Sequence, residues 1–304
     1  MRPSHPPTLI TLARRTIRDA ALFGPGDRVL AAVSGGPDSM TLLHVLAGLR
    51  KSVGHELFAH GVDHALRRDA AAELDQAERL ATALGVPFTR TRVAVDPGGN
   101  LQARARAARY NALRQAAQAL RVTAIATGHH ADDRAETVLI RLLRGAGPTG
   151  LAVLPPRADD LVRPFIRARR VDVLAHAGRH AIPFCCDPSN ANPRFLRTRV
   201  RLELLPALEA LSPNIAAHLC ALADQLAGAR DPEPHMHTLG RASRDAIAKL
   251  SQTQSKKGRV RLPGGLVATY DPTKRAIVVQ LDAPTDAPTG VEEGAAVEEP
   301  GIRW

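Results

Sequence analysis

Cysteine and aromatic residues are scarce in this chain. It contains three cysteines among 304 residues, and no two of them form a CxxC pair. This spacing supports neither a disulfide framework nor a zinc or iron–sulfur site. Phenylalanine, tyrosine and tryptophan together make up 3% of the residues, which argues against a row of aromatic side chains that stack on single-stranded bases.

Long apolar runs are also missing. No stretch approaches the roughly 20 apolar residues that a helix needs to span a bilayer. Residues 1–7 are polar and rich in proline, without the apolar core of a secretory signal. We therefore expect a cytoplasmic protein with no membrane partner.

Positive charge is abundant and unevenly distributed. The net charge is +11, but residues 282–304 contain six acidic residues and one arginine. That segment carries −5, which leaves +16 for the rest of the chain. A net charge of +16 over residues 1–281 predicts a polyanionic partner, and a nucleic acid is the partner we expect. The alternative is a coding bias that enriches arginine and alanine without any functional meaning.

The strongest local signal is the string SGGPDS at residues 34–39. It follows the apolar run Val29–Val33, a predicted strand, and precedes the apolar residues Met40–Leu46, a predicted helix. Glycines let backbone N–H groups approach an anion, and the first N–H groups of a helix lack partners within the helix. The string therefore predicts a phosphate site. No lysine follows the glycines, so the pattern is not the usual P-loop.

Predicted strands and helices alternate through the first half of the chain. The strands lie at 29–33, 56–63, 88–95 and 122–127, and the helices at 9–23, 40–46, 70–84, 101–120 and 131–143. This alternation predicts an α/β fold with a parallel, doubly wound sheet. Ligands of such sheets bind beyond the carboxyl ends of the strands. The loop at Ser34 lies at one such end.

The pattern changes after Pro155. Helices are predicted at 208–227 and 241–250, and strands of a small C-terminal domain at 259–265 and 274–281. We predict a catalytic domain over residues 1–205, a helical linker with the small C-terminal domain over 206–281, and an acidic, disordered tail over 282–304.

A second polar cluster is GHHADDRAET at residues 128–137. On the predicted helix, Asp133 and Glu136 are three residues apart and share a face. Three interpretations remain open for these carboxylates. They stabilise the helix N-terminus through its dipole, they bind a metal ion together with the histidines, or they bind a substrate.

Eight strings occur in the order typical of one family: VSGGPDSM, VDHALR, ARAARY, GHHADDRAET, RLLRGAG, RPF, DPSN and RTRVRLELLP. With them the chain resembles the tRNA(Ile)-lysidine synthetase family of the N-type ATP pyrophosphatases, from about Leu30 to Leu208 and more weakly through Gly265. The resemblance implies an adenine nucleotide alpha hydrolase-like fold. It also implies ligation of L-lysine to the wobble cytidine of the CAU anticodon of tRNA(Ile), with ATP and Mg²⁺. The cytidine would be adenylated first, and AMP and pyrophosphate would be released.

The resemblance also implies roles for individual residues. ATP would be bound by Ser34, Gly35, Gly36, Pro37, Asp38, Ser39, His64, Arg67, Arg106, Gly128 and His129, with Mg²⁺ on Asp38. The substrate lysine would be bound by Asp133 and Glu136, which with Asp38 and Arg106 form the catalytic set. The tRNA would contact Arg109, Arg144, Asp187, Asn190, Arg197 and Arg201. Two positions depart from the family pattern: Thr198 replaces a frequent asparagine and Gln102 a frequent glutamate.

Two other functions fit part of the sequence. A tRNA thiolase of the same ATP pyrophosphatase group usually needs paired cysteines, which this chain lacks. A non-catalytic tRNA-binding relative on a degenerate scaffold is opposed by the intact Asp38, Asp133 and Glu136. The chain also resembles a compact family member without the C-terminal module of longer relatives. Two-fold pairing is common among soluble proteins, so a homodimer is a further possibility.

Overall fold

The computed structural model describes residues 7–63, 70–94, 101–185 and 194–228, and, further along, residues 246, 249–250, 252–253, 258–262, 266–272 and 276–281. By compactness the chain divides into two units, Met1–Pro232 and Glu233–Trp304. This division lies inside the segment 206–281, which was predicted to contain a helical linker and the small C-terminal domain. The predicted tail over 282–304 lies outside the described residues.

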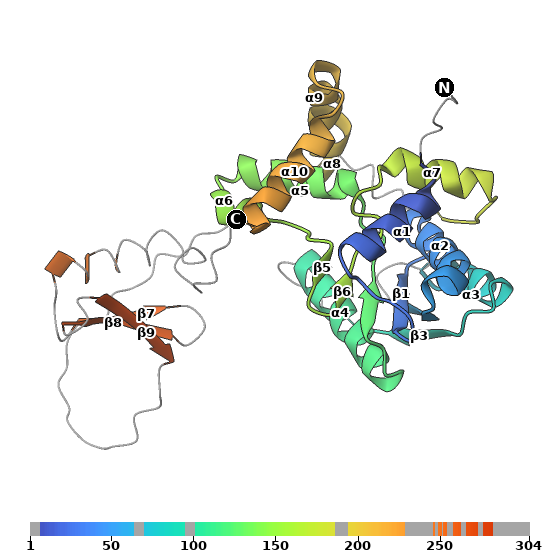
Figure 1. Cartoon of the computed structure of the whole chain (residues 1–304), viewed down its shortest axis with the longest axis horizontal. Helices are drawn as coiled ribbons and strands as arrows, with labels where there is room; N and C mark the ends of the chain where they lie inside the picture. Colours follow the sequence, from blue (N-terminus) through green and yellow to red (C-terminus); the bar gives the residue numbers. More distant parts are fainter. Residues whose placement is uncertain are drawn as a thin grey trace. The chain divides into compact units, whose positions relative to one another are not determined.

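A six-stranded sheet with strand order β3-β2-β1-β4-β6-β5 forms the centre of the first unit (Figure 1). The first four strands occupy the predicted places: β1 (Arg28–Val33), β2 (Glu56–Asp63), β3 (Phe88–Arg92) and β4 (Ala124–Ala126). Neighbours among them pair in parallel, and β1 runs beside β2 from the Arg28–Glu56 pair to the Val33–Gly61 pair. The prediction of an α/β fold with a parallel sheet is confirmed for these four strands.

One edge of the sheet departs from the parallel prediction. The last two strands, β5 (Arg157–Ala158) and β6 (Leu161–Val162), pair antiparallel. Only two residues connect them, and Asp159 adopts a φ of 52°. A connection this short can join only antiparallel strands. Each strand has two residues, which is too few to produce a periodic signal in the sequence.

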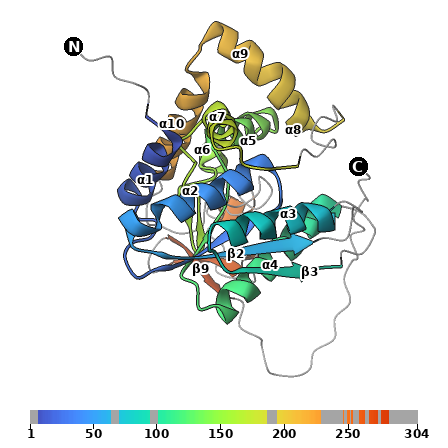
Figure 2. The ribbon, with the colours of Figure 1, turned by 90° about the vertical axis from the view of Figure 1, so that its right-hand side faces the viewer.

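Helices cover both faces of the sheet (Figure 2). On one face, Val29, Ala31 and Val33 of β1 join the main apolar core with α1 (Leu9–Asp19), α2 (Pro37–Val53), α3 (Ala70–Ala83) and α7 (Arg170–Arg179). On the other, Leu30 packs with Leu113 and Ala117 of α4 (Leu101–Ala119). Side chains of a strand alternate between faces, so a strand buried on both sides reads as a continuous apolar run. The predicted doubly wound arrangement is therefore present, although α7 was not predicted.

Beside the sheet, a group of helices packs around its own apolar cluster (Figure 1). The cluster is formed by α5 (Ala131–Leu143), α6 (Pro148–Leu151), the π-helix η2 (Val200–Leu204), α9 (Leu205–Leu211) and α10 (Ile215–Gly228), and the short helix α8 (Leu196–Arg199) leads directly into η2. The single helix predicted over 208–227 is two helices. Ser212 leaves the helical conformation at φ −143° and ψ 98°, and the following Pro213 disfavours helix at that position.

The second unit contains a three-stranded antiparallel sheet of β7 (Arg259–Leu262), β8 (Leu266–Asp271) and β9 (Ala276–Leu281). Two of these strands were predicted. The strand β8 was missed, although it contributes the buried Ala268 and Tyr270 that pack with Leu250. The helix predicted over 241–250 lies largely outside the described residues. Among the helices that are described, none has the length and apolarity to cross a membrane.

Candidate active site

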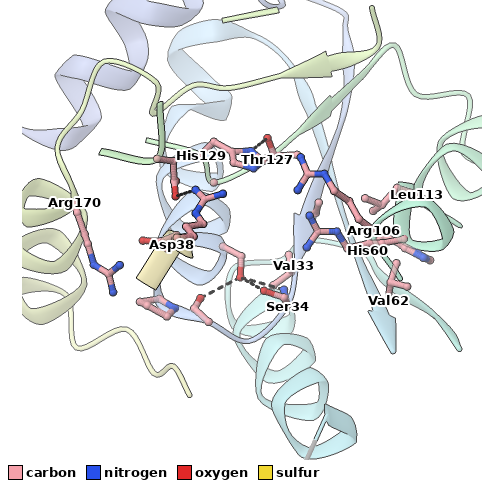
Figure 3. A pocket seen from close by; sticks show the side chains of 18 of the residues that line it. Val33, Ser34, Asp38, His60, Val62, Arg106, Leu113, Thr127, His129 and Arg170 are labelled. Atoms are coloured by element: carbon pink, nitrogen blue, oxygen red, sulfur yellow. Dashed lines mark hydrogen bonds and ion pairs between the residues drawn. The ribbon is translucent and has the colours of Figure 1, made fainter. Parts of the chain in front are cut away.

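A pocket of about 430 Å³ opens at the carboxyl ends of β1, β2 and β4 (Figure 3). This volume lies within the range typical of small-molecule sites, and the position is the one expected for a ligand of a doubly wound sheet. Twelve of its lining residues were predicted: Ser34, Gly36, Pro37, Asp38, Ser39, Arg106, Arg109, Gly128, His129, Asp133, Arg197 and Arg201. The pocket therefore collects four separate sequence motifs.

The glycine loop owes its shape to Gly35. This residue has a φ of 78°, and a Cβ built on it would lie 2.7 Å from the Glu73 Cβ and 2.9 Å from the Glu73 carbonyl oxygen. Only glycine satisfies both the backbone angle and the space. Gly35 itself does not line the pocket. Its part in the site is thus the conformation of the loop.

Two serines close the loop against the first turn of α2. The Ser34 backbone N–H donates to the Ser39 Oγ at 3.1 Å, and the Ser39 hydroxyl donates to the Gly36 carbonyl oxygen at 3.0 Å. Gly36 is the N-cap of α2 and has no side-chain cap, while Pro37 occupies the first helical position. The first N–H groups of α2 are thus left to an external acceptor, as at other anion-binding helix N-termini.

Gly128 allows the end of β4 to pass close to this loop. A Cβ at Gly128 would lie 2.9 Å from both the carbonyl carbon and the carbonyl oxygen of Asp38. A side chain there would push the loop away from the strand. Gly128 lines the pocket, but its necessity comes from this close approach of two backbones.

The helix α5 presents its acidic residues to the pocket through a capping box. The His130 Nδ1 accepts the Asp133 backbone N–H at 3.3 Å, and the Asp133 carboxylate accepts the His130 backbone N–H at 3.1 Å. His130 is fully buried. The box orients Asp133, and Glu136 lies one turn further along the same face.

Both carboxylates are bound by arginines of the segment α8–η2. The Arg197 guanidinium donates to Asp133 at 2.7 Å and to Glu136 at 2.9 Å. Arg201 donates to the two oxygens of Glu136 at 2.6 and 3.0 Å. Glu136 is 1% exposed, so its charge is compensated almost entirely by these two guanidinium groups.

Electrostatics keep Asp133 ionised in this environment. Burial acts to raise the pKa of Asp133, but the nearby His130 and Arg197 lower it by more, and the net pKa lies below the usual value. For Asp38 the balance is reversed. Burial raises the pKa of Asp38 despite the opposing effect of His130.

The end of the pocket away from Asp38 places two apolar side chains beside Arg106 and His60 (Figure 3). Val62 and Leu113 lie here with His60, whose Nδ1 is hydrogen-bonded to Thr89 Oγ1 at 2.7 Å (Figure 3). Burial lowers the pKa of His60, so the ring is neutral at physiological pH. The Arg106 guanidinium lies 5.0 Å from the centre of the Tyr110 ring and donates to its hydroxyl at 3.2 Å. An apolar slot beside neutral and cationic groups suits a nucleobase.

His129 is held at the end of β4. Its Nδ1 is hydrogen-bonded to Thr127 Oγ1 at 2.8 Å, and burial lowers its pKa to about 3. The ring is therefore neutral and serves as a hydrogen-bonding group rather than a cation at neutral pH.

Other predicted residues lie elsewhere. Gly35 and Glu136 support the pocket without lining it, and Arg144 is exposed at the C-terminal cap of α5, away from the lining residues. His64, Arg67, Asp187 and Asn190 lie outside the described residues. The individual roles assigned to all these residues stay predictions.

Sequence reasoning missed seven residues that line the pocket: Ala32, Val33, His60, Val62, Leu113, Thr127 and Arg170. A signal existed for several of them. His60 and Val62 stand near the end of a predicted strand, and Leu113 follows Arg106 and Arg109 at helical spacing on α4. For Arg170 the sequence held no such signal, because its helix was not predicted.

The sheet order, the glycine loop and the position of the pocket define a protein of the PP-loop class. The family described as "PP-loop domain" matches residues 12–208. Among solved structures, the U34-tRNA thiolase NcsA from Methanococcus maripaludis is similar in fold, with a TM-score of 0.63 and 19% identity over 74% of this chain and 80% of that one.

Comparison with curated sequences identifies the family within this class. The tRNA(Ile)-lysidine synthase of Gloeobacter violaceus is 38% identical, and the match covers 78% of this chain and 77% of that protein. The chain belongs to the tRNA(Ile)-lysidine synthase family. Its relatives from Rhodopseudomonas palustris and Symbiobacterium thermophilum are 41% and 39% identical over 68% and 72% of this chain. The matched part spans only 60% and 47% of those two proteins.

Proposed function

We propose that this protein joins L-lysine to the wobble cytidine of the CAU anticodon of tRNA(Ile), using ATP. One observation carries the proposal: a glycine loop suited to phosphate lines the same pocket as Asp133, a buried carboxylate suited to an amine, with Glu136 bound to the same arginine directly behind it. Family membership supports the same reaction. Holding three reactants in one site supplies the proximity that such a ligation needs.

ATP would lie with its phosphates on the loop and its base in the apolar slot. The free N–H groups at the start of α2 and the hydroxyl of Ser34 can donate to the phosphate oxygens, while the Ser39 hydroxyl donates to the Gly36 carbonyl oxygen and holds the loop in shape. Val62 and Leu113 would pack against adenine. We assign Arg106 to charge that develops on the phosphates during transfer, since preorganised cations stabilise such charge.

Asp38 fits a magnesium ligand. Its Oδ1 is buried and accepts no hydrogen bond from the described residues, and the nearest imidazole nitrogen, His130 Nε2, is 3.7 Å away. A cation would compensate this oxygen. No group of three His, Cys, Asp or Glu side chains in the described part of the chain is arranged to hold a metal. This agrees with Mg²⁺, which usually takes one or two carboxylates and completes its shell with phosphates and water. Bound there, Mg²⁺ would neutralise phosphate charge.

The proposed chemistry has two steps. First, the carbonyl oxygen of the cytosine attacks the α-phosphate of ATP, the bond to the β-phosphate breaks, and pyrophosphate leaves. Second, the lysine side-chain amine attacks the carbon that bears the adenylated oxygen. The carbon–oxygen bond then breaks, AMP leaves, and the amine loses its proton. Adenylation is needed because a carbonyl oxygen is a poor leaving group.

Asp133 and Glu136 are our candidates for holding the substrate lysine. In the free protein Arg197 and Arg201 occupy the same oxygens. An ammonium group carries the same charge as a guanidinium group and can replace one of them on Asp133. The released arginine is then available for tRNA phosphate, which agrees with the tRNA-side role predicted for Arg197 and Arg201.

The remaining parts of the proposal concern tRNA contacts, cellular location and pairing with a second copy. We place Arg109 at the tRNA side together with Arg144, Asp187 and Asn190, and we propose a cytoplasmic protein that pairs with a second copy. The basic composition of the chain favours tRNA binding through phosphates.

Incorporation of radiolabelled lysine into an unmodified tRNA(Ile) transcript with a CAU anticodon tests the function directly. The reaction contains ATP and Mg²⁺, and a methionine tRNA with the same anticodon is the control. We expect incorporation only into tRNA(Ile). Absence of incorporation, with ATP cleavage still dependent on tRNA, would retain adenylation and overturn the assignment of lysine.

A further inference from the structure

We propose that Arg170 contacts the pyrophosphate portion of ATP directly and that Asp132 is the residue that positions it. This inference rests on the proposed function, because it names an additional ligand contact in the same pocket. Neither residue was assigned a role from the sequence.

The carboxylate of Asp132 faces α7 rather than the pocket. Its two oxygens accept the Arg169 Nε, each at 3.1 Å, and its Oδ1 also accepts the Arg169 Nη2 at 2.8 Å. Its Oδ2 accepts the backbone N–H of Arg170 at 2.7 Å. Asp132 thereby ties the first turn of α7 to the first turn of α5.

Further contacts make this junction rigid. The Arg169 backbone N–H donates to Asp172 at 2.9 Å, and the Arg169 guanidinium also pairs with Glu209 of α9. Burial acts to raise the pKa of Asp132, but its hydrogen bonds from Arg169 and Arg170 outweigh burial and lower the pKa. An ionised Asp132 therefore holds the backbone of Arg170 in place at neutral pH.

The side chain of Arg170 lines the pocket on the side of Asp38. Figure 3 shows it across Asp38 from Arg106 and His60. Its guanidinium has no hydrogen bond or ion pair with any of the residues that the structure describes, whereas Arg197 and Arg201 are both bound to carboxylates.

A polyphosphate is the ligand that this arrangement fits. The helix α2 directs unpartnered N–H groups into the pocket from the loop, and Arg170 faces the same space from α7. A guanidinium group binds phosphate oxygens through two parallel hydrogen bonds, which an ammonium group cannot form. Pyrophosphate on the loop would therefore be held from two sides, by backbone N–H groups and by Arg170.

Calorimetric titration of the full chain with magnesium pyrophosphate tests the contact. We expect Arg170→Ala to weaken binding on the order of tenfold or more, because a charge-assisted bidentate contact is lost. Arg170→Lys should recover only part of the affinity. The control is Arg167→Ala, which removes an arginine three residues away that pairs with Asp19 and does not line the pocket.

The positioning role has its own readout. Asp132→Asn should raise the KM for ATP and leave the KM for lysine unchanged, and it should add little to Arg170→Ala in the double variant, because both act through one contact. Equal losses for ATP and lysine would mean a merely structural role and would contradict the assignment of Asp132. Unchanged pyrophosphate binding by Arg170→Ala, or a loss of tRNA affinity in its place, would overturn the contact itself.

The titration with magnesium pyrophosphate is independent of the proposed ligation. Pyrophosphate binding requires neither lysine nor tRNA, so the Arg170 contact can be confirmed even if lysine incorporation fails. Conversely, lysine incorporation with normal pyrophosphate binding by Arg170→Ala would support the function and reject the contact.

Discussion

The two sides of the pocket are built from different interactions. On the loop side, residues 34–39 use backbone geometry, and the necessary features are a positive φ at Gly35 and the close approach of Gly128. On the α5 side, Asp133 and Glu136 depend on Arg197 and Arg201, which lie more than sixty positions further along the chain. The first side depends on how closely backbones approach each other, because Glu73 lies against Gly35 and Asp38 against Gly128, whereas the second depends on ion pairs between side chains. Substitutions should therefore disturb the two sides in different ways.

The largest effect is expected for Gly35→Ala. The new Cβ would overlap Glu73 and the residue would need a φ of 78°, so the loop would lose its shape. We expect pyrophosphate binding to fall by about a hundredfold or more, since several N–H contacts are lost together. Titration with magnesium pyrophosphate measures it.

The matched control is Gly48→Ala on α2. A Cβ there meets nothing within 4 Å, and alanine is favoured over glycine inside a helix by about 0.5–1 kcal/mol. This variant should unfold at a higher temperature and bind pyrophosphate normally. If Gly35→Ala behaved like Gly48→Ala, the conformational role of Gly35 would be wrong.

Glu136→Gln should disrupt the α5 side of the pocket. Two guanidinium groups would lose their anionic partner at a site that is 1% exposed. We expect a loss of about 2–3 kcal/mol in the free energy of unfolding, below the cost at a fully buried pair because Arg197 is 43% exposed. Denaturant unfolding measures the loss, and pyrophosphate binding should change little.

Glu203→Gln provides the comparison, on the segment that carries Arg197 and Arg201. Glu203 pairs with Arg199 on the surface, with side chains 56% and 60% exposed. Such a pair contributes about 0.3–0.5 kcal/mol. Equal destabilisation by the two variants would show that burial does not distinguish the pairs.

A smaller, pH-dependent effect is expected behind the loop, where α2 meets α7. The Nδ1 of His44 and the Nε2 of His176 are hydrogen-bonded at 3.1 Å, and burial lowers the pKa of His176 to about 4. The unfolded chain then binds more protons than the folded one, so stability falls as the pH decreases from about 6.5 to 4. His176→Gln should flatten the dependence of the free energy of unfolding on pH in this window. An unchanged slope would assign the dependence to other groups.

The smallest effect is expected for Arg144→Ala. This residue is exposed and lies away from the pocket. Pyrophosphate binding and stability should remain as in the unmodified protein, and tRNA affinity should fall by about twofold, as for a single exposed phosphate contact at moderate salt. Filter binding at two salt concentrations measures it. A large loss of pyrophosphate binding would contradict the location of the site.

Much of the fold was predictable, and the failures have physical causes. The strand β2 and the helix α5 occupy the predicted residues because each has a clear apolar period and clear end signals. The strands β5 and β6 were missed because they have two residues each. The helix α7 was missed because its basic residues obscured the apolar stripe formed by Val173 and Ala177.

The candidate site was predicted to a similar extent. The loop and the cluster at residues 128–137 were found because each motif is contiguous and lies at the end of a strand. That Asp133 and Glu136 are bound by Arg197 and Arg201 was not predicted. Nothing in the local pattern of these arginines distinguishes them from exposed Arg199, which pairs within its own helix.

The sequence by itself determined the alternation of strands and helices, the glycine loop and the position of the acidic pair, because backbone preferences and apolar periodicity act over a few neighbouring residues. Only the tertiary structure decided which charges meet. The direction of Arg170 into the pocket, the clamp of Asp132 on α7 and the neutralisation of Glu136 each join segments about 40 or more positions apart. Such contacts depend on how helices pack beside the sheet, and packing is settled by the whole chain rather than by any single stretch of it.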